Sequence, residues 1–449
     1  MKSKKNRKYK KVSRSTNIKS KKNIYIIILI PLLLLIAILS LLYFQKPIDK
    51  YVEIEGLHGR VMNDLLDVDD LIFEMKNENY VLLGESTHGT DEYYLIRKYI
   101  TQELIKNHGF NFIVLEGVWA SIYELNKHVK NLEGSKETAR EAMESLDRWP
   151  EWMWKNNHIL ELIEWLRIHN DKLPENEKVG IYGMDVYSPL NSYEKLKEFL
   201  NENNIEVQGI RELDLCFEGF GYNFDNYPSF YAQTRNSCEE EIKNTKQELL
   251  ELELSSKERF LVEQKISVVK NAEKHYRNMV FQNYDSWNYR SSHFADTVIR
   301  ASNYYGENSK GIAWAHNTHV GDSSFVQGAE GMLNIGRILR EKNKNTFILG
   351  FVKNEGRVSA GNAWGSNKQI MNVPEAMPHS YGALFAEQGL EKALFVFQEN
   401  HSTPLRNHRA IGVIYNPFQE QGNYVPTIIT KRYDAVIFIK ETNELLSLI

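Results

Sequence analysis

The chain has 449 residues with a formal net charge of −4 at pH 7, and it contains two cysteines, Cys216 and Cys238. This length allows a large buried core and as many as three domains, whereas so few thiols exclude a cysteine-rich zinc or iron–sulfur site. Eleven Lys or Arg fall within residues 1–22, which leaves 44 basic and 59 acidic side chains in the rest of the chain and argues against nucleic acid as a partner.

A membrane span is predicted near the amino terminus. Residues 24–44 carry no charge, and a helix of this length is about 30 Å long, which matches the hydrocarbon thickness of a bilayer. The basic residues before it keep the amino terminus in the cytoplasm, so we expect the rest of the chain outside. A cleaved signal peptide is the alternative, but the apolar run is too long and no small-residue cleavage site follows it. The sequence thus predicts a single-pass cell-membrane protein that has the lipid bilayer as a partner.

The chain is expected to divide into an anchor and one folded domain. The expected parts are a basic cytoplasmic tail (1–23), a transmembrane helix (24–44), a tether (45–75) and a domain (76–449) with a helical insertion at about 192–305. Both cysteines lie in that insertion, where the spacing is compatible with a disulfide and equally with two free thiols.

Residues 80–97 read YVLLGESTHGTDEYYLIR and predict a strand, a turn and a helix. Glu85 and His88 lie in the turn, at the carboxyl end of the strand, where open α/β sheets bind their ligands. A carboxylate three residues from an imidazole is suited to fix the tautomer of a general base. The alternative is that the polar residues of this turn only cap the helix and that His88 is a surface histidine.

Ionisable residues follow three more predicted strands. Glu116 ends the strand NFIVLEG, Asp185 follows KVGIYGM, and the histidines His316 and His319 follow GIAWA. Because the carboxyl ends of parallel strands meet at one edge of a sheet, we expect these side chains to converge with the turn at 84–90. A helix-capping role for Glu116 is the alternative reading of that residue.

The remaining segments are mostly helical until the last third of the chain. Residues 119–170 are rich in tryptophan, at positions 149, 152, 154 and 165, and these side chains fill a core or line a cleft. Residues 287–300 begin with a polar cluster that includes Arg290. Further strands are predicted at NTFILGF, ALFVF and AVIFI, and this alternation predicts a three-layer α/β/α fold with a mostly parallel central sheet.

These motifs together resemble the erythromycin esterase family. The resemblance rests on LGESTHGTDEYYLIR, IVLEG, GMD, WAHNTHV with the NIGRILRE helix, and RAIGVIYNPFQE with YDAVIFI, and it covers most of residues 75–440. It implies an α/β/α hydrolase that opens macrolide lactones or cleaves other esters, without a cofactor general to the family. Two features depart from the drug-resistance members: the membrane anchor, and the large helical region. The anchor places hydrolysis outside the cell, so the substrate is a macrolide or another ester.

The resemblance also implies roles for single residues. His88 matches the general base that activates water, Glu85 and Glu116 match essential carboxylates, and Arg97 matches an arginine on the following helix. His316 and His319 match paired histidines near the reacting carbonyl, so His316 is expected to stabilise the oxyanion. We predict that His319, Asp185 and Arg290 bind the substrate. A structural ion pair between Arg97 and Glu116 is the alternative role for that arginine.

Two other functions use the same residues. A metal-dependent hydrolase is possible because histidines and carboxylates are competent ligands, although no metal is predicted. A non-catalytic domain that binds haem or a polyanionic ligand is the second alternative. A serine nucleophile is disfavoured because Gly84-Glu-Ser-Thr-His is not a Gly-x-Ser-x-Gly elbow.

Overall fold

The computed structural model describes residues 51–281, 283–342, 345–398 and 401–449. The predicted basic tail and transmembrane helix, residues 1–44, lie outside the described residues. Within the described part of the chain, no helix combines the length and the apolar character needed to cross a bilayer.

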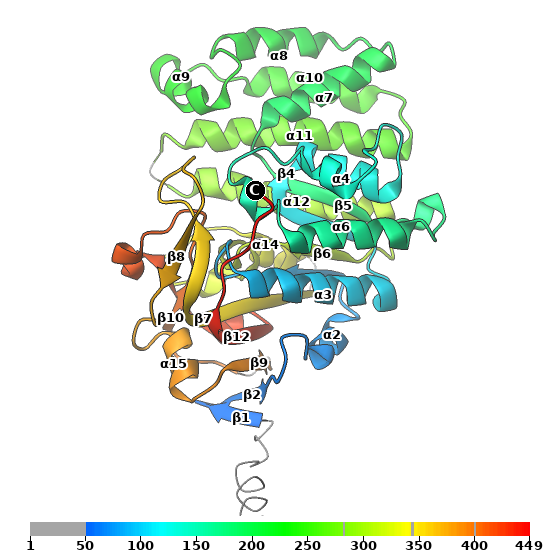
Figure 1. Cartoon of the computed structure of the whole chain (residues 1–449). Helices are drawn as coiled ribbons and strands as arrows, with labels where there is room; N and C mark the ends of the chain where they lie inside the picture. The colour runs from blue at the N-terminus through cyan, green and yellow to red at the C-terminus, as the bar shows by residue number, and fades with distance from the viewer. Residues whose placement is uncertain (1–50, 282, 343–344, 399–400) are drawn as a thin grey trace, which may run out of the picture. The chain divides into compact units, whose positions relative to one another are not determined.

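The described chain folds into strands and helices that alternate in part, with an uninterrupted helical stretch from α7 to α12 (Figure 1). The strands are β1 (Tyr51–Ile54), β2 (Leu57–Val61), β3 (Tyr80–Leu83), β4 (Phe112–Val118), β5 (Gly180–Asp185), β6 (Gly311–Trp314), β7 (Thr346–Ala360), β8 (Gln369–Val373), β9 (Lys392–Val396), β10 (Arg406–Arg409), β11 (Tyr424–Thr427) and β12 (Ala435–Thr442). The α-helices are α2 (Asp69–Met75), α3 (Asp91–His108), α4 (Trp119–Lys130), α5 (Ala139–Met143), α6 (Asn157–Asn170), α7 (Pro189–Glu202), α8 (Gln208–Glu218), α9 (Tyr227–Thr234), α10 (Glu239–Glu251), α11 (Ser256–Asn278), α12 (Asp285–Tyr305), α13 (Asn317–Val320), α14 (Ile335–Lys342), α15 (Tyr381–Glu387) and α16 (Ile429–Arg432). Short 3₁₀ helices are η1 (Glu151–Met153), η2 (Glu175–Glu177), η3 (Phe224–Asn226), η4 (Ser323–Phe325) and η5 (Pro417–Asn423).

One large sheet organises the domain. Within the described residues ten strands form it, in the order β1-β2-β9-β12-β7-β3-β6-β4-β5, with β8 paired to β7. The neighbours from β12 to β5 are all parallel. Strands β9, β2 and β1 continue the sheet as an antiparallel edge. The predicted α/β architecture is therefore confirmed, with a parallel centre and an antiparallel edge that the sequence pattern did not indicate.

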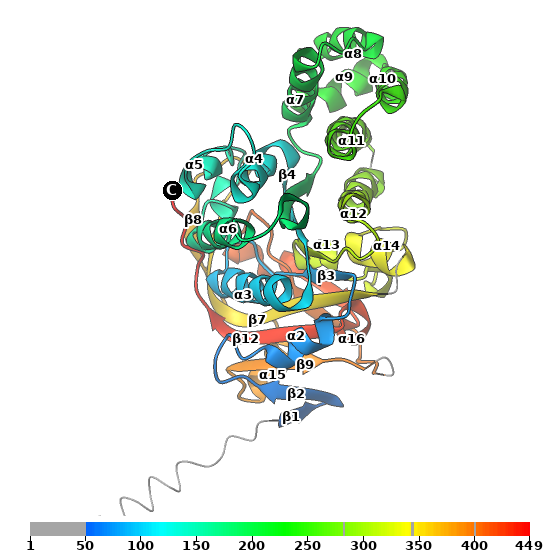
Figure 2. The same cartoon turned by 90° about the vertical axis from the view of Figure 1, so that its right-hand side faces the viewer.

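Helices cover both faces of the sheet, as Figure 2 shows from the side. Val81 and Leu83 of β3 pack into the core beneath α2, α3 and α6, whereas Tyr80 and Leu82 pack into the core beneath α12, α14 and α15. Side chains alternate across a strand, so a strand covered on both faces must be apolar at every position. This requirement explains the unbroken apolar run YVLL, all four residues of which are buried.

The helical insertion forms a layer of its own. Helices α7 to α11 enclose a separate apolar core that includes Leu213, Phe217 and Ile266, and Figure 2 shows these helices beyond the sheet, on the side of α12. Helix α12, which we expected within the insertion, instead packs on the sheet through Phe294 and Val298. The insertion proper thus runs from α7 to α11, and α12 connects it to the sheet.

A disulfide between Cys216 and Cys238 closes the helical layer, which resolves the alternative that the spacing left open. The two residues are 22 positions apart and join α8 to the start of α10. A disulfide that closes a loop of this size reduces the conformational entropy of the unfolded chain, which raises the free energy of the unfolded state by about 3 kcal/mol at 25 °C.

We therefore expect the double substitution Cys216→Ser with Cys238→Ser to lower the free energy of unfolding by about that amount. Denaturant titration followed by circular dichroism measures it; a change below about 1 kcal/mol would contradict the expectation.

Residues 51–75 differ from the tether that we expected over 45–75. Strand β2 pairs with β9 and extends the sheet, and β1 pairs with β2 as its outermost strand. Helix α2 buries Leu71, Ile72 and Met75, which belong to the core on one face of the sheet. Residues 51–75 are therefore part of the folded domain. The sequence pattern did not indicate this, because short strands at a sheet edge carry little periodic signal.

Candidate active site

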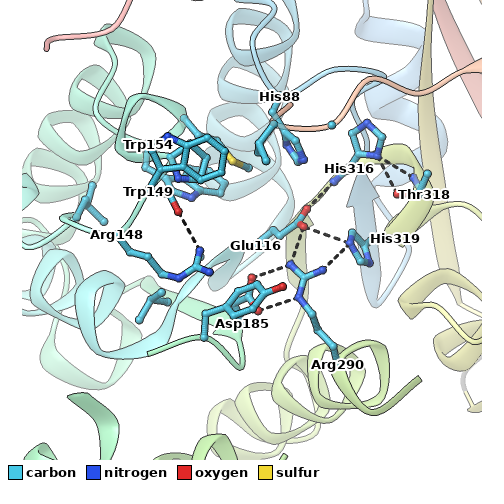
Figure 3. Close-up of a pocket in the computed structure, with 18 of the residues that line it drawn as sticks. His88, Glu116, Arg148, Trp149, Trp154, Asp185, Arg290, His316, Thr318 and His319 are labelled. Atoms are coloured by element: carbon cyan, nitrogen blue, oxygen red, sulfur yellow. Dashed lines mark hydrogen bonds and ion pairs between the residues drawn. The ribbon is translucent and has the colours of Figure 1, made fainter. Parts of the chain in front are cut away.

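A cavity of about 360 Å³ opens at the carboxyl ends of the parallel strands. His88, Glu116, Asp185, Arg290, His316 and His319 all contribute to its lining (Figure 3). These residues follow or end β3, β4, β5 and β6, apart from Arg290, which lies on α12. The expected convergence at one edge of the sheet is therefore what the structure shows.

The turn after β3 presents His88 to this cavity. Nδ1 of His88 lies 2.8 Å from Oε1 of Glu85, and Oε2 of Glu85 accepts a hydrogen bond of 2.6 Å from Arg97. A carboxylate only accepts hydrogen bonds, so Nδ1 carries the proton and the Nε2 lone pair of the neutral ring is free. Arg97 is fully buried between the rings of Tyr94 and Trp314. The three side chains form a series of hydrogen bonds in which Arg97 orients Glu85 and Glu85 orients His88.

The environment of His88 sets its proton affinity. Burial lowers the pKa of the imidazole, but the hydrogen bond to Glu85 and the negative charges of Glu85 and Glu116 outweigh burial. The net result is a pKa raised above the ordinary value of 6.5. A raised pKa makes His88 a stronger base once it is neutral, and it also requires a higher pH for the neutral form.

Four chain segments hold the backbone of the turn. The carbonyl of Glu85 accepts from the amide of Asn317, and that of Ser86 accepts from the amide of Ile411. The carbonyl of Gly89 accepts from the amides of Ser359 and Leu445. A side chain at Gly89 is excluded, because a Cβ atom there would lie 1.8 Å from the carbonyl oxygen of Ser359. The turn is thus fixed by contacts from the sheet and from the carboxyl-terminal segments.

Glu116 connects the strand ends. Its Oε2 accepts from the backbone amide of His316 at 2.9 Å, and its Oε1 lies 3.0 Å from Arg290 and 3.2 Å from Nε2 of His319. Burial opposes ionisation of Glu116, but the contacts with His319 and Arg290 hold the pKa of its carboxyl well below the usual range. The pairing of β4 with β5 shifts register between Leu115 and Val118, and such irregularities redirect side chains.

Arg290 and Asp185 form the floor of the cavity. The guanidinium of Arg290 binds both oxygens of Asp185, at 2.9 and 2.7 Å, and also contacts Nε2 of His319 at 2.9 Å. Burial raises the pKa of Asp185, but the charge and hydrogen bonds of Arg290 outweigh it and lower the pKa below 3.8. The ring of His319 stacks on Trp287, with centroids 4.4 Å apart. These polar groups thus bond to one another, whereas Nδ1 of His319 is buried and makes no hydrogen bond within the described residues.

His316 lies next to His88 in the cavity, with ring centroids 4.8 Å apart. Its Nδ1 accepts from the backbone amide of Thr318 at the start of α13, so the proton of the neutral ring lies on Nε2. Burial, reinforced by the nearby His88, holds the pKa of His316 well below 6.5. Nε2 is buried and has no hydrogen-bond partner within the described residues. His316 is therefore a neutral donor whose Nε2 makes no well-formed hydrogen bond within the described residues, and the backbone carbonyl of Ser86 is a nearby acceptor that acts to raise its pKa.

The structure changes the interpretation of several predicted residues. Arg97 pairs with Glu85 rather than with Glu116, so the structural ion pair that we considered is wrong in its partner. Arg97 and Glu85 lie behind His88 and are not part of the cavity lining. The three residues expected to bind substrate line the cavity and also contact one another: Arg290 pairs with Asp185 and contacts His319.

The sequence did not identify the aromatic walls of the cavity. Trp149 and Trp154 line it, whereas Trp152 is in the core and Trp165 stacks on His169. Other lining residues that sequence reasoning missed come from distant segments: Leu146, Arg148, Pro150, Met153, Tyr187, Trp287, Thr318 and Trp364. The tryptophan-rich stretch was the available signal, but periodicity alone does not separate a core tryptophan from one that faces a cleft.

No set of three or more His, Cys, Asp and Glu side chains within residues 51–281, 283–342, 345–398 and 401–449 has an arrangement that would hold a metal ion. The hydrogen bonds of this region occupy Nδ1 of His88, Nδ1 of His316 and both oxygens of Glu116.

The fold and site together define an α/β protein whose cavity contains a histidine oriented by a carboxylate beside a second, neutral histidine. The family model for erythromycin esterase matches residues 105–442, which is most of the chain. The chain belongs to the erythromycin esterase family, as its motifs suggested. This membership supports hydrolase activity on esters or lactones.

Solved structures with low sequence identity share the fold. A succinoglycan biosynthesis protein and a protein from Bacillus cereus are 17% and 18% identical to this chain, each with a TM-score of 0.69. The alignments cover 86% and 87% of this chain and 95% and 96% of those chains. A mutant of the erythromycin esterase EreC in its open conformation is 15% identical, with a TM-score of 0.63, covering 86% of this chain and 98% of that one.

Proposed function

We propose that the protein hydrolyses a carboxylic ester or lactone by direct attack of a water molecule that His88 deprotonates. One observation carries the proposal: two histidines with opposite hydrogen-bonding roles lie side by side in the cavity. His88 has a free Nε2 lone pair because Glu85 binds Nδ1, and His316 has a free Nε2 proton because Nδ1 accepts from Thr318. Ester hydrolysis requires such a base beside a donor for the developing oxyanion.

The chemistry follows from these roles. Nε2 of His88 takes a proton from water as the water oxygen bonds to the ester carbonyl carbon. The carbonyl oxygen becomes an oxyanion, which accepts a hydrogen bond from Nε2 of His316. The tetrahedral intermediate then expels the alcohol oxygen, which takes the proton back from His88. Glu85 stabilises the imidazolium in between, and Arg97 keeps Glu85 in place; both are positioning residues.

The name of one structural neighbour suggests macrolide esters, and the name of another suggests a link to polysaccharide synthesis. We therefore propose an ester or lactone hydrolase without committing to either substrate. Assay of the purified full-length protein against a panel of aryl esters, macrolide lactones and acylated sugars tests the function. Turnover that His88→Ala abolishes supports it. If no ester is turned over while wild type and His88→Ala bind a common ligand equally, a non-catalytic binding domain is the correct reading.

The rate of hydrolysis should depend on pH through His88. The base acts only when neutral, and its pKa is raised above 6.5, so kcat/KM should fall as the pH drops through a value above 6.5. Replacing Glu85 by Gln removes the charge that raises the pKa, so the acidic limb should move to lower pH and kcat should fall. Assays of wild type and Glu85→Gln from pH 5 to 9 measure the acidic limb of each protein; a limb that Glu85→Gln leaves unmoved would contradict this assignment.

The metal-dependent alternative is separated by a different measurement. Under our proposal, prolonged treatment with a strong chelator leaves kcat unchanged, and elemental analysis of the active protein finds no stoichiometric metal. Loss of activity that added Zn²⁺ or another divalent ion restores would instead favour a metal-assisted mechanism.

We also propose that residues 24–44 anchor the protein in the cell membrane, with the catalytic domain outside the cytoplasm. The uncharged stretch and the eleven preceding basic residues support this. The disulfide adds to it, because disulfides persist in oxidising compartments. Protease applied to intact cells should remove the domain; full protection of the domain in cells whose envelope is permeable to the protease would argue against this orientation.

A further inference from the structure

A second cavity adjoins the catalytic one. It has a volume of about 340 Å³ and shares three lining residues with the first cavity: Arg148, Trp149 and Trp364. Its remaining walls come from residues 188–191 at the start of α7, residues 223–225, and Tyr276 of α11. The substrate space therefore extends past the three shared residues toward the helical layer.

Arg148 differs from the other arginines of the site because it makes no ion pair within the described residues, although its charge helps to lower the pKa of Asp185 at longer range. Arg97 is bound to Glu85, and Arg290 is bound to Asp185 and Glu116. Among the described residues no carboxylate lies within ion-pair distance of Arg148, and its one hydrogen bond is donated by Nη1 to the carbonyl of Trp149, at 3.0 Å. The other N–H groups of its guanidinium are left for solvent or a ligand.

Aromatic rings hold the guanidinium at the junction. It lies 3.9 Å from the ring centroid of Tyr187 and 5.3 Å from that of Trp364. Figure 3 shows the side chain reaching from its backbone toward the middle of the catalytic cavity, beneath Trp149. Rings on its faces leave the donor edges of a planar guanidinium available, and those edges match the geometry of an oxyanion.

The neighbouring charges define where an anion fits. Asp185 and Glu116 belong to the catalytic cavity, but their oxygens accept from Arg290, from His316 and from the backbone. Asp225 lines the outer wall of the second cavity and is exposed, so it disfavours an anion at that end. An anionic group is therefore best accommodated at Arg148, where the two cavities meet.

We propose that Arg148 is a specificity residue that binds an oxyanion group, such as a carboxylate, on the substrate ester. The inference rests on the proposed hydrolase function and adds the substrate class to it: an ester with an acidic group some distance from the scissile carbonyl. The apolar part between them lies against Trp149 and Trp154. An ester with a cationic group in the same place would meet the charge of Arg148 instead.

Matched esters test the proposal in the full-length protein. The substrates are para-nitrophenyl monoesters of straight-chain diacids from succinate to suberate, each paired with the neutral ester of the same chain length. At the best length, wild type should favour the acidic ester by about tenfold or more in kcat/KM, the range of a charge-assisted hydrogen bond. Arg148→Gln should remove most of this preference, and Arg148→Lys should keep part of it. Arg211→Gln, an exposed arginine of α8, is the control and should leave the preference unchanged.

Binding separates this inference from the hydrolase proposal. The monoanilides of the same diacids resist hydrolysis, and calorimetry should find that wild type binds them more tightly than the neutral anilides, with the preference lost in Arg148→Gln. Turnover without any acidic preference overturns the assignment of Arg148 while the hydrolase function stands. An acidic preference in binding without turnover of any ester supports the anion site and overturns the hydrolase function.

Discussion

Replacing His88 by alanine is expected to lower kcat for ester hydrolysis by about 10²- to 10⁴-fold, the usual contribution of a general base. The free energy of unfolding should change little in comparison, because the ring lies at the cavity wall and its removal leaves Glu85 still bound by Arg97. Steady-state kinetics with a para-nitrophenyl ester and thermal denaturation of the same preparation measure the two effects.

The control for this experiment is His169→Ala. His169 stacks on Trp165 and takes no part in the cavity, so kcat should stay within about twofold of wild type. His316→Ala should also lower kcat, by about 10²-fold, through the loss of one oxyanion donor. A His88→Ala protein that keeps most of the wild-type kcat/KM would remove His88 from the role of base.

Replacing Arg97 by methionine is expected to destabilise the domain by about 3 to 5 kcal/mol. Glu85 and Arg97 are both fully shielded from solvent, and removing one partner of a buried pair leaves an uncompensated charge. The midpoint of guanidinium denaturation, analysed with the slope of the transition, measures the loss. Activity should fall as well, because Glu85 would no longer be held against His88.

Two comparisons make this result specific. Lys243 forms an exposed pair with Glu240 on α10, and Lys243→Met should cost less than about 1 kcal/mol. Adding Glu85→Gln to Arg97→Met removes the orphaned charge, so the double variant should recover part of the stability lost by the single one. If Arg97→Met lowers the free energy of unfolding by less than about 1 kcal/mol, solvent or another cation compensates the charge of Glu85.

The parts of the site predictable from sequence are those that follow strands. Tyr80 to Leu83 read as a buried strand because both faces are covered, and the helix predicted after the turn is α3, which begins at Asp91. The polar residues after four strands came together because a parallel sheet places its carboxyl ends at one edge. The local sequence pattern and the topology of a parallel sheet were sufficient to predict the strand, the helix and the convergence of these polar residues.

The partners of those residues depend on long-range packing, which local pattern does not contain. Arg290 reaches Asp185 across 105 positions of sequence, because the helical layer returns the chain to the sheet through α12. Arg97 binds Glu85 rather than Glu116 because helix α3, which carries Arg97, packs behind the turn that contains Glu85. The edge strand β2 depends on β9, more than three hundred residues away, so nothing near residue 57 indicates a strand.

The four backbone contacts of the turn at Glu85–Gly89 have a consequence for how substrate selectivity changes within this architecture. The backbone that carries Glu85 and His88 is held in place before any ligand enters, so under the proposed function their alignment would cost little at the moment of reaction. The wall of the cavity that includes Trp364 is not part of these contacts, so substitutions there are expected to change substrate selectivity rather than the alignment of His88.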